Sequence, residues 1–163
     1  MFNKKQVMEF LPHRDPFLFI DSVKDVQLPE ALKGMKGPFR VQDLIGGKSI
    51  CTFRVENSVK VLEGHFPGNP ILPGVVQIEM MAQAASFLCV HMLTKPLEET
   101  KLEVALITVE AAKFKRPVVP PMDLEIHATL IRSRGMFQSY NCEIFTDGEL
   151  VSQCSVMATI KLS

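Results

Sequence analysis

The chain has 163 residues, of which 47% are hydrophobic, so it is long enough to bury a substantial core within one domain spanning 1–163. Lys plus Arg and Asp plus Glu both number 18, and this balance removes the overall attraction to phosphate that is typical of nucleic-acid-binding proteins. The four cysteines lie apart without CxxC pairs, which predicts reduced thiols in a core and no zinc site.

The N-terminal segment predicts a short helix and no secretion signal. Asn3 is a good N-cap, and the stretch after it ends at Leu11 and Pro12, so we expect a helix over about 3–10. The apolar patch in this stretch is much shorter than that of a signal peptide, which predicts a cytoplasmic protein. Residues 17–20 are expected to begin the first strand.

The segment 27–48 predicts a long loop or insertion. It contains two prolines, four glycines and several lysines, and a single helical turn is expected at 30–33. Two interpretations of this segment stay open, a lid over a binding site and a disordered excursion.

The following segments predict a strand and then the one long helix of the chain. From Ser49 onward, apolar and polar residues alternate as in a strand with one face in a core. From Pro73 to about Leu93 the residues are apolar nearly all round, so we expect a helix that a sheet wraps on most sides. The run from Ile71 is long enough to cross a membrane, but Glu79 within it favours a buried helix of a soluble core.

The remainder of the chain predicts antiparallel strands. Residues 104–109 form a continuous apolar run, and apolar residues alternate with polar ones over 122–130. Asp147-Gly148 is a hairpin turn signal between the segments 137–145 and 150–161. The order of elements predicts an α+β fold in which an antiparallel sheet curls around a central helix.

The stretch GHFPGNPILPG, residues 64–74, places one histidine in a stiff loop directly before the central helix. Prolines restrict this loop, and its glycines allow another molecule to approach the backbone closely. His65 has two interpretations, a loop histidine bonded to a backbone carbonyl group or a general base. The rigidity of the loop favours the general base.

Glu79 is unusual because it lies near the middle of an otherwise apolar helix. Burial would raise its pKa and keep it protonated as an acid; alternatively, it pairs with a Lys or Arg of a neighbouring element. Gln83 follows one turn later, within reach of a hydrogen bond to the Glu79 carboxyl group. Gly74 offers a helix N-terminal N–H to a carbonyl oxygen that gains negative charge. This set suits proton abstraction beside a carbonyl with loss of a hydroxyl group from the next carbon.

Three motifs carry a resemblance to a known family. They are LPHRDPFL at 11–18 with Asp21, GHFPGNPILPGVVQIEMMAQAA at 64–85, and KFKRPVVP at 113–120. In this order, and along most of the chain, they resemble the FabZ-type (3R)-hydroxyacyl-[acyl-carrier-protein] dehydratases. The resemblance implies a hotdog fold and a homodimer, or a hexamer as a trimer of dimers. It also implies a lyase of fatty-acid biosynthesis that converts (3R)-hydroxyacyl thioesters into trans-2-enoyl thioesters.

The same resemblance implies the roles of the site residues. His65 matches the catalytic base, and Glu79 of the partner subunit would face it. Gly74 matches the position whose N–H polarises the thioester carbonyl, and Phe66 and Gln83 are predicted to bind substrate with it. The acyl chain would arrive on the phosphopantetheine arm of an acyl carrier protein, and no metal or redox cofactor is expected.

Two further groups of charged residues carry weaker predictions. Carrier proteins are acidic, so a basic patch would favour docking, and Lys115 and Arg116 are the preferred candidates. His13 and Arg14 lie in a turn, and we expect them to hold that turn and the N-terminal helix rather than to act in catalysis.

Departures from the family pattern keep other functions open. The connection 27–48 is longer than usual, and residues 105–108 lack the glycine that the family carries in this stretch. The alternatives are a dehydratase of a specialised, polyketide-like pathway, a hotdog thioesterase, and a non-catalytic acyl-binding subunit. His65 opposite Glu79 argues against the thioesterase, and the presence of both residues argues against the binding subunit.

Overall fold

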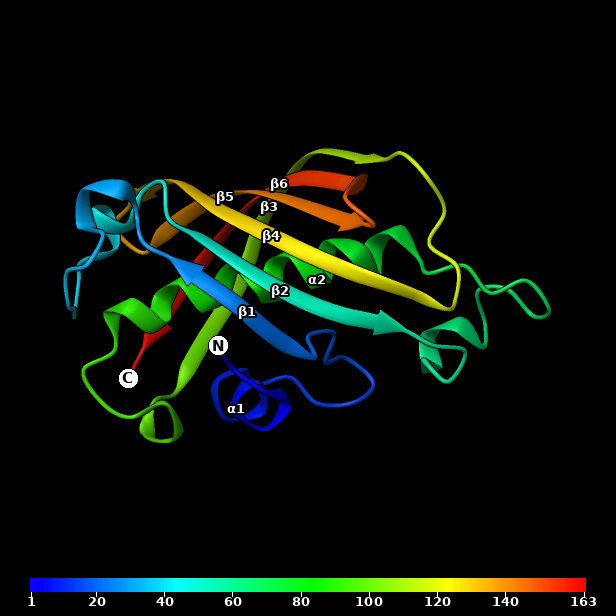
Figure 1. The fold of residues 1–163 in the computed structure, drawn as a ribbon, viewed down its shortest axis with the longest axis horizontal. Helices are drawn as coiled ribbons and strands as arrows, with labels where there is room; N and C mark the ends of the chain where they lie inside the picture. The colour runs from blue at the N-terminus through cyan, green and yellow to red at the C-terminus, as the bar shows by residue number, and fades with distance from the viewer.

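The computed structural model of the chain describes residues 1–163 and places two α-helices with one six-stranded sheet (Figure 1). The helices are α1 (Lys4–Phe10) and α2 (Gly74–Ser86). The strands are β1 (Ser22–Gln27), β2 (Lys48–Val55), β3 (Leu102–Phe114), β4 (Met122–Arg134), β5 (Phe137–Thr146) and β6 (Glu149–Leu162). Short 3-10 helices are η1 (Glu30–Leu32), η2 (Val41–Leu44), η3 (Lys60–Leu62), η4 (Phe87–Met92) and η5 (Leu97–Glu99). The predicted α+β class is confirmed.

The strand order in the sheet is β1-β2-β4-β5-β6-β3, and every neighbouring pair is antiparallel. The strands β4, β5 and β6 form a meander, whose second hairpin turns at the predicted Asp147-Gly148 pair. Both turn residues have positive φ values, 50° and 78°, as a two-residue hairpin turn of type I′ requires. Because β3 pairs only with β6, it forms an edge of the sheet, and one of its sides has no strand beside it.

The central helix α2 lies across the concave face of the sheet, which curls around it (Figure 1). Its residues after the first turn are mostly Met, Ala and Gln, which favour helix. Helical backbone continues through η4, so the predicted helix over 73–93 is confirmed, with its last turns in 3-10 geometry. The segment Gly74–Met92 is long and apolar enough to cross a bilayer, but 61% of it is buried by the rest of the chain, as in a core helix.

The core lies between α2 and the concave face of the sheet, as one cluster of 34 buried residues. Inward side chains of β4 alternate with outward polar ones, as the period of a strand requires. Those inward residues are at most 2% exposed: Leu124, Ile126, Ala128 and Leu130. All four cysteines are buried and free, and burial raises the pKa of Cys89 to about 12, so its thiol stays protonated.

The N-terminal segment contains the predicted helix but not the predicted strand. Asn3 caps α1 through a capping box with Gln6, which confirms the helix start. The prediction of a strand over 17–20 is wrong, because the first strand begins at Ser22. The backbone of this stretch is bonded instead by a side chain of α2: Phe19 N–H donates to the Gln83 amide oxygen at 2.9 Å.

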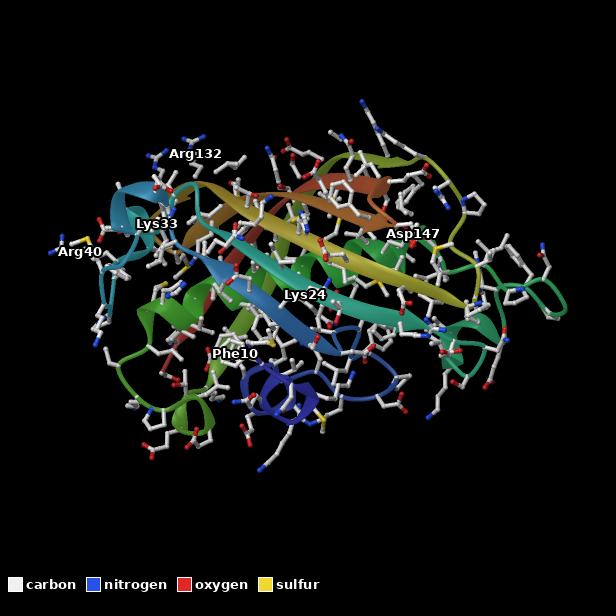
Figure 2. All side chains as sticks on the ribbon, in the orientation of Figure 1. Phe10, Lys24, Lys33, Arg40, Arg132 and Asp147 are labelled. Atoms are coloured by element: carbon white, nitrogen blue, oxygen red, sulfur yellow. The ribbon has the colours of Figure 1, made fainter.

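The segment 27–48 is held by backbone hydrogen bonds at one end of the sheet. Phe39 N–H donates to His91 O at 2.9 Å, and Gly46 N–H donates to Leu130 O at 2.8 Å. The expected turn appears as η1, and Lys33 and Arg40 lie at the same end of the molecule as Arg132 (Figure 2). The loop after η3 lies at the opposite end (Figure 1), so this segment does not cover His65 of its own chain.

Candidate active site

The loop between η3 and α2 holds His65 through several hydrogen bonds. Phe66 and Asn69 exchange two backbone bonds, and Ile71 N–H donates to the His65 carbonyl oxygen at 2.8 Å. Leu72 N–H donates to Val118 O, which fastens the end of the loop to the segment after β3. The predicted stiffness therefore comes from bonds on both sides of the loop as well as from its prolines.

The ring of His65 is oriented by the loop itself. Its Nδ1 lies 2.7 Å from the carbonyl oxygen of Ile71, and the ring stacks on Phe66 with centroids 4.0 Å apart. A carbonyl oxygen only accepts, so Nδ1 carries the proton of the neutral ring and Nε2 keeps a free lone pair. The bond to a backbone carbonyl group, one of the two interpretations of His65, thus prepares Nε2 to act as a base.

His65 opens into a pocket of about 560 Å³ that also reaches the start of α2. Pro73 is the N-cap, and the N–H groups of Gly74 and Val75 form no hydrogen bond within the chain. Free N–H groups at the positive end of a helix dipole attract a negative oxygen. The predicted oxyanion donor at Gly74 therefore lines the same pocket as His65.

Phe114, at the end of β3, covers Gly74. A Cβ atom at position 74 would lie 2.8 Å from the Phe114 ring, closer than real Cβ contacts. Only glycine therefore fits under this ring without moving it.

Glu79 lies on α2 with two protein partners at one carboxyl oxygen. Its Oε1 accepts from Gln83 Nε2 at 2.8 Å, and His13 Nε2 lies 3.2 Å from the same oxygen. Gln83 also donates to Phe17 O at 2.7 Å. The contact between Gln83 and Glu79 was predicted from their spacing; because the Gln83 amide already bonds protein groups, its role in substrate binding stays a prediction.

The expected rise in the pKa of Glu79 does not occur. The hydrogen bond from His13 lowers this pKa, burial acts in the opposite direction, and Gln83 adds to the lowering. The partner of Glu79 is also a histidine rather than the Lys or Arg of the alternative interpretation. Because this histidine lies far away in the sequence, the spacing on α2 gave no signal of it.

Of the two residues that were predicted to hold the N-terminal turn, Arg14 does so and the His13 side chain contacts Glu79 instead. Arg14 Nη1 donates to the carbonyl oxygens of Leu11 and His13, so Arg14 holds the turn as predicted. The His13 side chain, in contrast, contacts Glu79, which sequence reasoning missed. The feature of the sequence that could have indicated a role of His13 near the site is its position in the motif LPHRDPFL, one of the three motifs that resemble the family.

Within one chain, the structure gathers the predicted residues into two separate groups. His65, Phe66 and Gly74 lie together at the N-terminus of α2, beside Phe114. Glu79 lines a different cavity of about 150 Å³, whose apolar wall includes Val104 and Leu106 of β3. The cavities share no residue, so one chain does not bring His65 and Glu79 together.

The two preferred basic residues both line the His65 pocket. Arg116 is paired with Glu149, whereas Lys115 has no ion pair. No group of three or more His, Cys, Asp or Glu side chains is arranged to hold a metal ion.

Comparison with known proteins gives consistent matches. The ApeI-like family model, ApeI dehydratase, matches residues 41–154. A 3-hydroxyacyl-[acyl-carrier-protein] dehydratase FabZ of Rickettsia felis is 33% identical over 96% of this chain and 94% of its own length. The FabZ of Nitratiruptor sp. is 34% identical over 98% of both chains. That of Acidiphilium cryptum is 37% identical over 94% of this chain and 82% of its own.

Solved structures share the architecture at low sequence identity. The dehydratase heterocomplex ApeI:P of Xenorhabdus doucetiae has a TM-score of 0.66 and 19% identity, covering 95% of this chain and 90% of that one. A thioesterase superfamily member of Thermus thermophilus has a TM-score of 0.57 and 16% identity, covering 72% and 82%. These likenesses confirm the predicted hotdog fold.

Proposed function

Because this chain belongs to the family of FabZ 3-hydroxyacyl-[acyl-carrier-protein] dehydratases, we propose that it removes water from (3R)-hydroxyacyl thioesters on acyl carrier protein. The product is the trans-2-enoyl thioester, and the pathway is fatty-acid biosynthesis. The observation that supports this reaction best is that one pocket is lined both by His65, whose Nδ1 is held by Ile71 O, and by Gly74 and Val75, whose N–H groups are free.

In the proposed reaction, His65 Nε2 takes a proton from the carbon next to the thioester carbonyl. Negative charge develops on the carbonyl oxygen and is stabilised by the Gly74 and Val75 N–H groups. The C–O bond at the next carbon breaks, and the hydroxyl group leaves as water with a proton from Glu79. A C=C bond forms without oxidation or reduction, so the proposal includes no redox cofactor.

The site requires two chains in this proposal, and β3 supplies the interface. Its free edge exposes large apolar side chains, including Leu106 at 44% and Ile107 at 48%. A two-fold antiparallel pairing of β3 centred near Val109 sets Val104 of one copy opposite Phe114 of the other. Val104 lines the Glu79 cavity and Phe114 the His65 pocket, so this pairing brings His65 toward Glu79 of the partner subunit.

A dimer is the smallest assembly that completes the site, and a trimer of such dimers would keep the same contact. Ile107→Lys is expected to place a charge in this interface, separate the subunits and lower activity at least about 10-fold. Sedimentation and turnover measure the two effects. Ile131→Lys is the matched control, since Ile131 is 45% exposed on β4, away from the free edge. An Ile107→Lys protein that stays dimeric and active would contradict the interface.

Gly74→Ala tests the oxyanion site. The new methyl group should displace the Phe114 ring and lower kcat/KM about 10-fold, since small misplacements beside reacting atoms are costly. Phe114 is 48% exposed in the single chain and is not part of its buried core, so each subunit should keep its fold, which circular dichroism measures. Gly64→Ala is the control, because a Cβ atom there meets nothing within 4 Å. Equal losses in both variants would argue against a special role of position 74.

We place the docking of the acidic carrier protein at the rim of the His65 pocket. Lys115 lines this pocket without an ion pair, so its charge is available to a partner. We also propose that the reaction is cytoplasmic and that residues 1–163 act as one domain, since one core cluster includes residues of α1, α2 and the sheet.

A second candidate is a dehydratase of a specialised, polyketide-like pathway, which the match to the ApeI-like family model over 41–154 favours. Both candidates perform the same chemistry on different acyl chains. Turnover of 3-hydroxyacyl groups on carrier protein, with saturated and polyunsaturated chains of several lengths, distinguishes them. Enoyl product supports dehydration and its chain preference selects the pathway. Free thiol would indicate a thioesterase, and binding without turnover an acyl-binding subunit.

A further inference from the structure

His13 reaches Glu79 from a part of the chain that is far away in sequence. Its Nε2 lies 3.2 Å from Glu79 Oε1, and both side chains are mostly covered, with 22% and 29% exposed. Gln83 fixes this approach, because one amide bonds Glu79 as well as the backbone of Phe17 and Phe19. The contact thus belongs to a network that ties the N-terminal segment to α2.

We propose that His13 is a positioning residue that holds the Glu79 carboxyl group and shares with it the proton that the leaving hydroxyl group receives. This inference rests on the dehydration proposed above. It assigns to the N-terminal segment a part in the acid half of the reaction, whereas His65 performs the base half.

The hydrogen-bonding of the His13 ring restricts where its proton can go. Within one chain, His13 Nδ1 is buried without a hydrogen-bond partner, so the ring makes its polar contact through Nε2, with Glu79. One proton then has two arrangements, a carboxylic acid beside a neutral imidazole or a carboxylate beside an imidazolium. When the hydroxyl group leaves, the pair gives up this proton and becomes carboxylate and neutral imidazole. A proton from solvent restores it.

The surroundings of the pair contain few other charges. The rest of the cavity is lined by groups that do not titrate, namely Ala82, Gln83, Ser86, Val104, Leu106 and Ala158. Outside the cavity, the Arg14 guanidinium group donates to the His13 carbonyl oxygen at 2.6 Å. Within one chain, His13 and Glu79 are therefore the titratable side chains of this cavity, and in the proposed dimer His65 of the partner subunit also faces Glu79.

The direction of the Glu79 pKa supports this sharing. The hydrogen bond from His13 lowers the pKa of Glu79. The Glu79 carboxyl group is therefore ionised at neutral pH, and a carboxylate cannot donate the proton that the leaving hydroxyl group needs. The leaving hydroxyl group then needs a proton that a second group helps to hold, and His13 Nε2, 3.2 Å from Glu79 Oε1, is the side chain placed to do so. Titration of such a pair gives apparent values that belong to both groups together.

The test compares pH profiles of kcat for wild type and His13→Gln. Glutamine keeps a donor to Glu79 but cannot carry the proton, so the alkaline limb of the profile should move to lower pH by about two units, the ordinary spacing of His and Glu. A purely structural role would lower kcat equally at every pH and leave the limb in place. That result would overturn the inference.

A second measurement does not depend on turnover. In His13→Ala, the carboxyl carbon of Glu79, followed by NMR and assigned with Glu79→Gln, should titrate at higher pH than in wild type, because the lowering hydrogen bond is gone. An unchanged midpoint in a folded variant would refute the contact. His127→Gln is the matched control for both experiments, since His127 lies 2.7 Å from Glu125 in another His–Glu pair, on the outer face of the sheet.

The two proposals fail in different ways. If wild type gives no enoyl product but the Glu79 midpoint shifts in His13→Ala, dehydration is wrong and the pairing of His13 with Glu79 still holds. If wild type dehydrates and the alkaline limb of His13→Gln does not move, dehydration stands and the shared proton is wrong.

Discussion

His65→Ala is expected to lower kcat/KM for dehydration by roughly 10³-fold, within the range that a positioned base contributes. Nδ1 of His65 is fixed on the Ile71 carbonyl oxygen, so Nε2 is the atom presented to the substrate, and alanine removes it. Turnover of a 3-hydroxyacyl group on carrier protein, with the enoyl product followed by mass spectrometry, measures the effect.

His127→Ala is a suitable control for this experiment, because His127 lies on the outer face of the sheet. This control should keep wild-type kinetics, and both variants should elute as wild type does. The ring of His65 is half-buried and packs mainly on Phe66, so loss of the ring should leave the fold intact. A His65→Ala enzyme within a factor of about ten of wild type would exclude His65 as the general base.

Glu79→Gln is expected to cost roughly 10²-fold to 10³-fold in kcat, because the amide cannot give up a proton to the leaving hydroxyl group. The isosteric amide should retain much of the local packing against Gln83. Binding of an acylated carrier protein should therefore persist while turnover is lost, which equilibrium binding and single-turnover measurements can separate.

The same two substitutions show whether the site is formed by two subunits. A purified dimer of one His65→Ala chain and one Glu79→Gln chain would contain one site with both substitutions and one intact site. Such a dimer should have about half of the wild-type activity, although each parent retains only about 1% of that activity or less. If His65 and Glu79 of one chain worked together instead, every site would carry one substitution, and the mixed dimer would be inactive as well.

Local patterns predicted most of the fold. The capping box at Asn3, the apolar run after Pro73 and the Asp147-Gly148 turn are encoded by neighbouring residues, and each element appears where it was expected. The stretch 17–20 was assigned wrongly to a strand because its apolar residues are indeed buried, with Phe19 only 1% exposed. What replaces strand pairing there is a side chain of α2, a tertiary contact that no local pattern contains.

In the site, too, contacts between residues close in the sequence were predicted, and the contact between distant residues was not. His65, Gly74 and the bond between Gln83 and Glu79 follow from one continuous motif, and the structure brings each set together. The pKa of Glu79 was expected to rise with burial, but the structure lowers it. The cause is His13, which is distant in the sequence and is brought to Glu79 only by the fold. The apolar helix around Glu79 predicted its burial, which raises the pKa. The sequence did not predict the hydrogen bond from His13, whose lowering of the pKa exceeds the effect of burial.

The position of β3 in the sheet also determines the order in which the chain can fold. Its hydrogen-bonding partner within the chain is β6, the last strand, although β3 is synthesised before β4 and β5. Until β6 leaves the ribosome, both edges of β3 stay unpaired, and its apolar side chains are exposed to other nascent chains. Closure of β3 on β6 joins residues distant in sequence and is expected to be the slow step, so conditions that delay it should favour aggregation.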